Sequence, residues 1–91
     1  MSIKVKIFYP ALQQVMNNQE TVAVEGQTVG ECLKDLVRQF PEANDLLFDS
    51  RGQLLKQVYV YVNAEGLQKA DFARRVTERD ELILAVLITG G

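Results

Sequence analysis

The residues with the clearest chemical potential are the last two, Gly90 and Gly91, which follow Thr89 and the apolar run 82–88. Glycine has no Cβ, so two consecutive glycines can enter, in extended form, a channel too narrow for other residues. At a free C-terminus the group at the end of this lead is a carboxylate. The pattern therefore predicts that the carboxylate of Gly91 is the reacting group. The ordinary alternative is a frayed chain end without a role.

The rest of the chain offers few groups for catalysis. It has 91 residues, no histidine and one cysteine, Cys32. Without histidine, acid–base chemistry near neutral pH would need a retuned carboxylate or lysine, so we do not expect an enzyme. One cysteine forms no internal disulfide, and no cysteine–histidine cluster exists to bind zinc, so no metal site is predicted. Cys32 lies on the apolar face of a predicted helix, which favours a buried structural residue over a sulfur relay.

Composition indicates one ordinary globular domain spanning residues 1–91, with a flexible tail at 88–91. Hydrophobic residues make up 47% of the chain and charged residues 24%, and the net charge is −2. No clustered basic patch predicts nucleic-acid binding. The N-terminus lacks the apolar core of a signal peptide, and the C-terminal apolar run is far shorter than the ~20 residues that span a bilayer. We therefore expect a cytoplasmic protein with neither nucleic-acid nor membrane partners.

The best-defined element is a helix from Thr28 to Phe40. Thr28 and Glu31 form a Thr-x-x-Glu capping box, and Pro41 ends the helix because proline disfavours the α conformation of the preceding residue. Apolar residues recur at intervals of three and four. This apolar face comprises Val29, Cys32, Leu33, Leu36, Val37 and Phe40.

Alternating or continuous apolar runs predict four strands, at 3–8, 20–25, 57–63 and 82–88. The last run is apolar at every position, which predicts a central strand buried on both faces, with the first strand as its parallel neighbour. An irregular loop with a turn at Asn17-Asn18 would join the first two strands. A short helix is expected within 42–48, with three residues on the core: Leu46, Leu47 and Phe48. In the irregular stretch 67–76, three more residues are expected to reach the core: Leu67, Phe72 and Val76.

Taken together, these features resemble the ubiquitin-like sulfur carriers of the MoaD/ThiS superfamily. The resemblance covers the whole chain and depends on the element order, the capped helix, the segment Val60–Asn63, the acidic turn at Asp80-Glu81 and the terminal Gly90-Gly91. It implies an α+β, β-grasp fold, with a mixed sheet of four to five strands and one main helix packed on one face.

The resemblance also implies a mechanism. An E1-like adenylyltransferase of the MoeB/ThiF type would adenylate the carboxylate of Gly91 with ATP, and a sulfur donor would convert it to a thiocarboxylate. The chain itself would bind no cofactor. Gly90 would pass through the partner's channel, and Leu87, Ile88 and Thr89 would pack at the channel mouth. The sulfur would then pass to a second enzyme.

Three aromatic residues, Phe8, Tyr59 and Tyr61, are expected on the sheet face away from the helix. They form either ordinary packing beneath a loop or an exposed patch that docks partners. The sequence leaves both alternatives open.

The branch of the superfamily is also open. Segments 52–55 and 60–65 are closer to CysO-like carriers, which donate sulfide to a sulfhydrylase for the synthesis of cysteine or related amino acids. The alternative is a MoaD-like small subunit that inserts Gly91 into the large subunit of molybdopterin synthase. Val86-Leu87 replaces the Pro-Pro pair of many MoaD-type carriers, and Arg79 replaces a common glycine. Two hypotheses belong to other classes of function. The protein would be either a modifier joined to lysines of target proteins through Gly91, or an interaction module with an inert tail.

Overall fold

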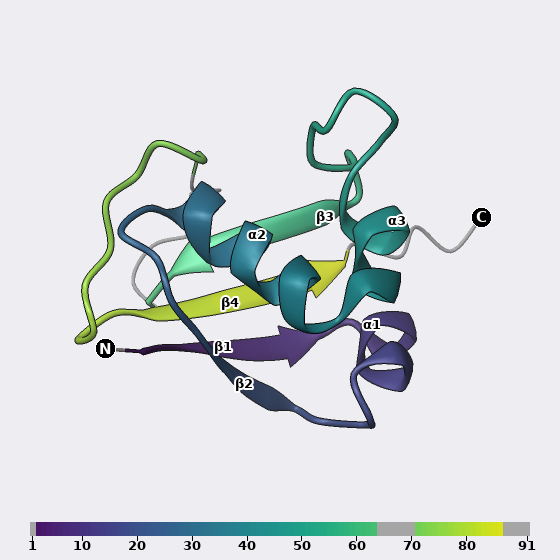
Figure 1. Cartoon of the computed structure of the whole chain (residues 1–91), viewed down its shortest axis with the longest axis horizontal. Helices are drawn as coiled ribbons and strands as arrows, with labels where there is room; N and C mark the ends of the chain where they lie inside the picture. Colours follow the sequence, from purple (N-terminus) through teal and green to yellow (C-terminus); the bar gives the residue numbers. More distant parts are fainter. Residues whose placement is uncertain (1, 64–70, 87–91) are drawn as a thin grey trace.

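The structure is a computed structural model, and it describes residues 2–63 and 71–86. These described residues form eight elements in chain order (Figure 1): β1 (Ile3–Phe8), α1 (Pro10–Val15), β2 (Thr21–Val24), α2 (Val29–Gln39), η1 (Pro41–Ala43), α3 (Asn44–Leu47), β3 (Val58–Val62) and β4 (Glu81–Val86). The strands form one sheet in the order β2-β1-β4-β3. β1 and β4 are parallel and the other two pairs are antiparallel. This mixed four-stranded sheet, with α2 across one face, confirms the predicted α+β, β-grasp fold.

Alternation along the strands places the core on one face of the sheet. Residues 3, 5 and 7 of β1 are buried while 4, 6 and 8 are exposed, and β3 alternates between buried and partly buried residues. The apolar face of α2 covers these side chains. Its fully buried contributors are Val29, Cys32, Leu33 and Leu36.

The helix α2 begins as predicted. The Thr28 side chain accepts a hydrogen bond from the Glu31 N–H at 3.1 Å, and Glu31 Oε1 accepts one from the Gln27 N–H at 3.2 Å. These bonds satisfy backbone donors that the first helical turn leaves without partners. Phe40 ends the helix before Pro41, where η1 begins.

The connection between β1 and β2 differs from the prediction. It contains the short helix α1, in which Pro10 occupies a first-turn position, where a missing N–H costs nothing. Leu12 and Met16 are fully buried beneath it, so core packing stabilises a helix whose local signal is weak. Asn17 and Asn18 turn the chain with φ of 59° each, as the asparagine pair predicted.

Two expectations about burial were wrong. β4 is not buried on both faces, because Leu82 and Leu84 are buried whereas Ile83 and Ala85 are partly exposed on a face that α2 does not cover. Phe72 does not reach the core, since it is 38% exposed, although Val76 does. The described part of the stretch 67–76 contains no strand, only an isolated bridge between Thr28 and Arg75.

Other expectations hold in part. In the predicted short helix 42–48, Leu47 is fully buried, whereas Leu46 and Phe48 are partly buried at the edge of the core. Leu67 lies outside the described residues, as does the end of the predicted last strand beyond Val86.

Candidate functional site

The last described residues of β4 are fixed by strands on both sides. Ala85 is in register with Phe8 of β1 and with Tyr59 of β3, and Val86 is in register with Val58. β4 is therefore a central strand as far as Ala85, and the last described residue, Val86, is paired with β3 alone (Figure 1). The predicted reactive and channel residues lie outside the described residues, and their roles stay predictions: Leu87, Ile88, Thr89, Gly90 and Gly91.

The sheet face opposite α2 carries an aromatic surface next to this strand end. Phe8 is 59% exposed, and the rings of Tyr59 and Tyr61 stack with centroids 6.3 Å apart and planes 9° from parallel. The register brings Phe8, Ala85 and Tyr59 into one row across three strands, with Ile83 and Tyr61 in an adjacent row. We call these five residues the aromatic face. Phe8 is the exposed member of the aromatic face, whereas Tyr59 and Tyr61 are partly buried, so both alternatives, packing beneath a loop and docking of partners, stay predictions.

The opposite end of the same face is charged. Lys6 lies beside Ile83 in the register and forms an ion pair with Glu81, at an Nζ–Oε1 distance of 3.7 Å. Both side chains are substantially exposed, so this pair adds little to stability. The sheet therefore presents an apolar half near Val86 and a charged half far from it.

A hydrogen-bonded clasp joins the C-terminal end of β3 to the N-terminal end of β4. Asn63 Nδ2 donates to Asp80 Oδ1 at 3.0 Å, and Asn63 Oδ1 accepts from the Glu81 N–H at 3.0 Å. The Thr77 N–H donates to Asp80 Oδ2 at 2.8 Å. The Asn63 amide, and after it the Thr77 N–H, lower the pKa of Asp80. The acidic turn is thus used internally to hold β4, and the part played by Asn63 was not predicted.

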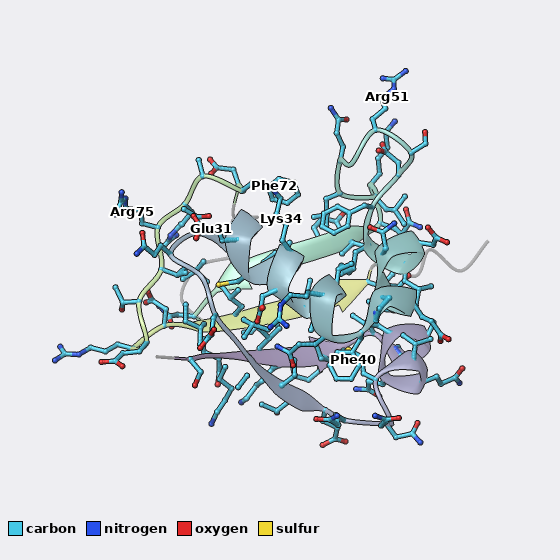
Figure 2. All side chains as sticks on the ribbon, viewed as in Figure 1. Glu31, Lys34, Phe40, Arg51, Phe72 and Arg75 are labelled. Atoms are coloured by element: carbon cyan, nitrogen blue, oxygen red, sulfur yellow. The ribbon has the colours of Figure 1, made fainter. Side chains whose placement is uncertain are left out.

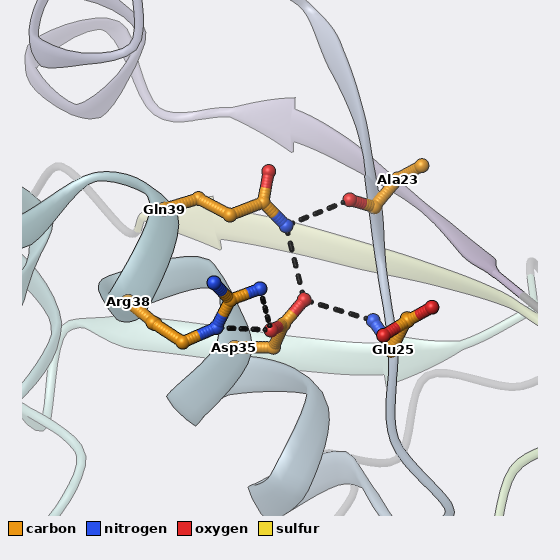
Figure 3. A network of polar contacts seen from close by, with 5 residues as sticks. All are labelled: Ala23, Glu25, Asp35, Arg38 and Gln39. Atoms are coloured by element: carbon orange, nitrogen blue, oxygen red, sulfur yellow. Dashed lines mark hydrogen bonds and ion pairs between the residues drawn. The ribbon is translucent and has the colours of Figure 1, made fainter.

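A second polar network attaches α2 to the end of β2 (Figure 3). Asp35 Oδ2 accepts hydrogen bonds from the Glu25 N–H at 2.9 Å and from Gln39 Nε2 at 3.0 Å. Arg38 donates twice to Asp35 Oδ1, at 2.9 and 2.7 Å. Gln39 Nε2 also donates to the Ala23 carbonyl at 2.9 Å. The Glu25 N–H is the largest cause that lowers the pKa of Asp35, and Arg38 and Gln39 add to it.

Cys32 is a core residue, as predicted. It is fully buried, and burial raises the pKa of its thiol to about 11, with smaller contributions from Glu31 and Asp35. Sulfur chemistry requires the thiolate, and this thiol stays protonated at neutral pH. A sulfur relay through Cys32 is therefore not supported.

Residues 2–63 and 71–86 contain no group of three or more histidine, cysteine, aspartate or glutamate residues placed to hold a metal ion. No helix in this part of the chain has the length and apolar character needed to cross a membrane.

The element order and the mixed sheet define a small ubiquitin-like protein of the β-grasp class. No protein-family model matches the sequence, and no curated protein matches it significantly. Solved structures do. SAMP1 from Haloferax volcanii is 30% identical over 100% of both chains, with a TM-score of 0.85. A chain of the Amycolatopsis orientalis BexX/CysO complex is 20% identical over 98% of this chain and 99% of that one, with a TM-score of 0.81. Mycobacterium tuberculosis CysO is 23% identical over 94% and 99%, with a TM-score of 0.79.

The likeness to SAMP1 identifies the family, whereas the two CysO structures, at lower identity, support the fold. The chain belongs to the ubiquitin-like β-grasp sulfur carriers of the MoaD/ThiS type.

Proposed function

We propose that this protein carries sulfur on its terminal residue, Gly91, as a thiocarboxylate. The observation that supports this most is the geometry of β4, which β1 and β3 hold on both sides as far as Ala85 and which β3 holds at Val86, beside the aromatic face with its exposed Phe8. A partner that binds the aromatic face thereby receives the start of the tail in a defined position. Binding of the globular body then brings the reacting carboxylate close to the partner's catalytic groups.

The proposed chemistry takes place in the partner enzymes. An E1-like adenylyltransferase joins the Gly91 carboxylate to the α-phosphate of ATP and releases pyrophosphate. A sulfur nucleophile then attacks the acyl carbon, AMP leaves, and a thiocarboxylate remains. Gly90 and Gly91 supply a lead without Cβ atoms, and Leu87, Ile88 and Thr89 pack at the channel mouth. This chain positions the reacting carbon and contributes no acid or base of its own.

For the acceptor, we propose a sulfhydrylase-type enzyme that makes cysteine or a related amino acid. The support is the likeness of segments 52–55 and 60–65 to CysO-like carriers. In the alternative, a large molybdopterin synthase subunit accepts the sulfur. Incubating the thiocarboxylate form with O-phosphoserine or O-acetylserine and a matching sulfhydrylase tests the first acceptor. Cysteine should form only when the thiocarboxylate is present, and its absence with both substrates would favour the alternative.

Protein modification is a second candidate function, and one observation favours it. The H. volcanii structures, at 30% and 28% identity, are of a protein named small archaeal modifier protein 1. A modifier would be joined through Gly91 to lysines of other proteins. Covalent conjugates of a tagged chain in cell extract would support this function, and a pure carrier would leave none.

The experiment that tests the central proposal is an intact-mass measurement. The purified protein is incubated with an E1-like enzyme, ATP and a sulfide source, and fragmentation locates any change. We expect replacement of one oxygen by one sulfur at Gly91. A chain that ends at Thr89 is the matched control and should show no change while keeping its fold. A mass shift located elsewhere, or one that persists in the shortened chain, would contradict the proposal.

A further inference from the structure

A second surface lies on the helix side of the molecule, away from the aromatic face. It is an open groove of about 400 Å³, between α2, the hairpin 49–53 and the arm 71–76. This is within the size range of roughly 300–1,000 Å³ that is common for ligand sites. We call it the helix groove. Its described lining residues are Gly30, Lys34, Val37, Asn44, Phe48, Gly52 and Phe72.

Backbone hydrogen bonds fix one wall of the helix groove. The Gly30 N–H donates to the Phe72 carbonyl at 3.0 Å, and the Val29 N–H donates to the Arg74 carbonyl at 2.9 Å. A Cβ at Gly30 would lie 3.2 Å from the Phe72 Cβ, so the arm sits directly on the first turn of α2. Phe72 is held over the helix at this point, beside Lys34 (Figure 2).

The opposite wall is the hairpin after α3. Asp49 Oδ1 accepts hydrogen bonds from the Arg51 N–H at 2.8 Å and the Gln53 N–H at 3.0 Å, and Gly52 turns the chain with φ of 80°. The Phe48 ring meets the Phe72 ring edge to face, with centroids 6.0 Å apart. The helix groove is thus preformed, with two aromatic rings as walls that core packing does not fully use.

Charge distinguishes the helix groove from a plain apolar hollow. Lys34 is the only charged residue among its described lining residues. The ion pairs in the described part of the chain involve other cations, Lys6 and Arg38. The helix neighbours that could neutralise Lys34 are engaged elsewhere, because Glu31 caps α2 and Asp35 binds the Glu25 N–H and Arg38.

We propose that the helix groove binds a segment of a partner protein in which an aromatic or branched aliphatic side chain lies next to a carboxylate. The apolar side chain packs against Phe48, Phe72 and Val37, and the carboxylate pairs with Lys34. The helix groove shares no residue with the aromatic face and lies across the sheet from it, so both surfaces can be occupied at once. The inference does not depend on the chemistry of Gly91.

A titration of ¹⁵N-labelled full-length protein by NMR tests this proposal. The probe is an acetylated, amidated peptide of sequence aspartate-phenylalanine-glutamate-leucine, and its control has both acidic residues replaced by their amides. We expect saturable shifts of the amides of Gly30, Gly52 and Phe72. Lys34→Gln should weaken binding about 2- to 5-fold, the range for one exposed ion pair. Lys56→Gln, the matched control, removes an exposed lysine outside the groove and should leave the affinity unchanged.

Several outcomes would overturn the proposal. Shifts centred on the aromatic face, or equal affinities of the Lys34 and Lys56 variants, would assign the binding elsewhere or to nonspecific charge. Equal binding of the amide control would remove the carboxylate from the recognition. If residues 64–70 of this chain occupied the groove, the peptide would cause no shifts. If a second copy of the chain occupied it, the amides of the groove would shift when the protein is diluted without peptide.

Discussion

Replacing Asn63 by alanine removes the two hydrogen bonds that the Asn63 side chain makes in the clasp between β3 and β4. Asn63 is the only residue of the clasp that contacts both the Asp80 carboxylate and the Glu81 N–H. It also has φ of 59°, a left-handed conformation that alanine adopts less easily than asparagine. The substitution therefore combines two lost hydrogen bonds with backbone strain.

The cost follows from these contributions. The neutral bond with the Glu81 N–H contributes about 1 kcal/mol to the free energy of unfolding. A bond to a charged group, such as the Asp80 carboxylate, contributes about 1.5–3 kcal/mol, and partial exposure of this site favours the lower end of that range. Left-handed backbone adds about 1 kcal/mol for alanine. We expect the free energy of unfolding to fall by about 3 kcal/mol, a large part of the ~5–15 kcal/mol typical of a domain. Asn63→Gly should recover about 1 kcal/mol of this, because glycine carries no strain there.

Urea denaturation followed by circular dichroism measures these differences. Asn18→Ala is the matched control, because Asn18 has the same φ of 59° but is exposed and makes no side-chain hydrogen bond to the rest of the described chain. It should cost only the strain, about 1 kcal/mol. The reasoning is refuted if the Asn63 and Asn18 alanine variants lose equal stability, since the clasp would then contribute nothing.

Four further predictions concern other parts of the molecule. Phe8→Ser removes an exposed aromatic ring, so the KM of the activating enzyme for this carrier should rise about 5- to 30-fold, the range for loss of 1–2 kcal/mol at an interface hot spot. The free energy of unfolding should stay unchanged. An unaltered KM in a pyrophosphate-release assay would exclude the aromatic face from docking. Gly26→Ala should destabilise the fold by about 1–3 kcal/mol in urea denaturation, because the new Cβ would lie 2.8 Å from the backbone nitrogen of Cys32. The free energy of unfolding should fall as pH rises from about 9 to about 11, because the Cys32 thiol ionises in the unfolded chain but not in the folded protein, where its pKa is raised to about 11. The loss approaches about 2–3 kcal/mol, and Cys32→Ala should lack this component of the pH profile. Because the pKa of Asp35 is lowered in the folded protein, its carboxylate stabilises the fold fully above the pKa of the unfolded chain, about 3.9, and this stabilisation is lost as pH falls through the folded pKa. In Asp35→Asn, the free energy of unfolding should therefore depend less on pH in the acid range.

Local patterns were enough to predict most elements. The helix at 28–40 was predictable because its capping box and its apolar spacing are both encoded within one short segment. Strand alternation likewise gave the correct inward residues of β1 and β3. The apolar last run and the segment order also gave the parallel pairing of β1 and β4. These features depend on neighbours in sequence, or on one simple rule about which strands are central.

Other features required contacts between distant residues. α1 has a weak local signal, and burial of Leu12 and Met16 beneath it stabilises the helix. Phe72 is as apolar as any core residue, yet the arm that carries it is bonded to the first turn of α2, which leaves the ring on the surface. Composition alone does not distinguish such a residue from one in the core.

By itself, the sequence determined the kind of fold, the family resemblance and the terminal diglycine on which the proposed chemistry depends. Only the tertiary structure decided that Asn63 clasps Asp80, 17 residues away, and that the two phenylalanine rings and Lys34 form one groove. The physical reason is separation along the chain. Periodicity and capping act over one or two turns, whereas a clasp or a groove exists only after packing has fixed the positions of segments that the sequence keeps apart.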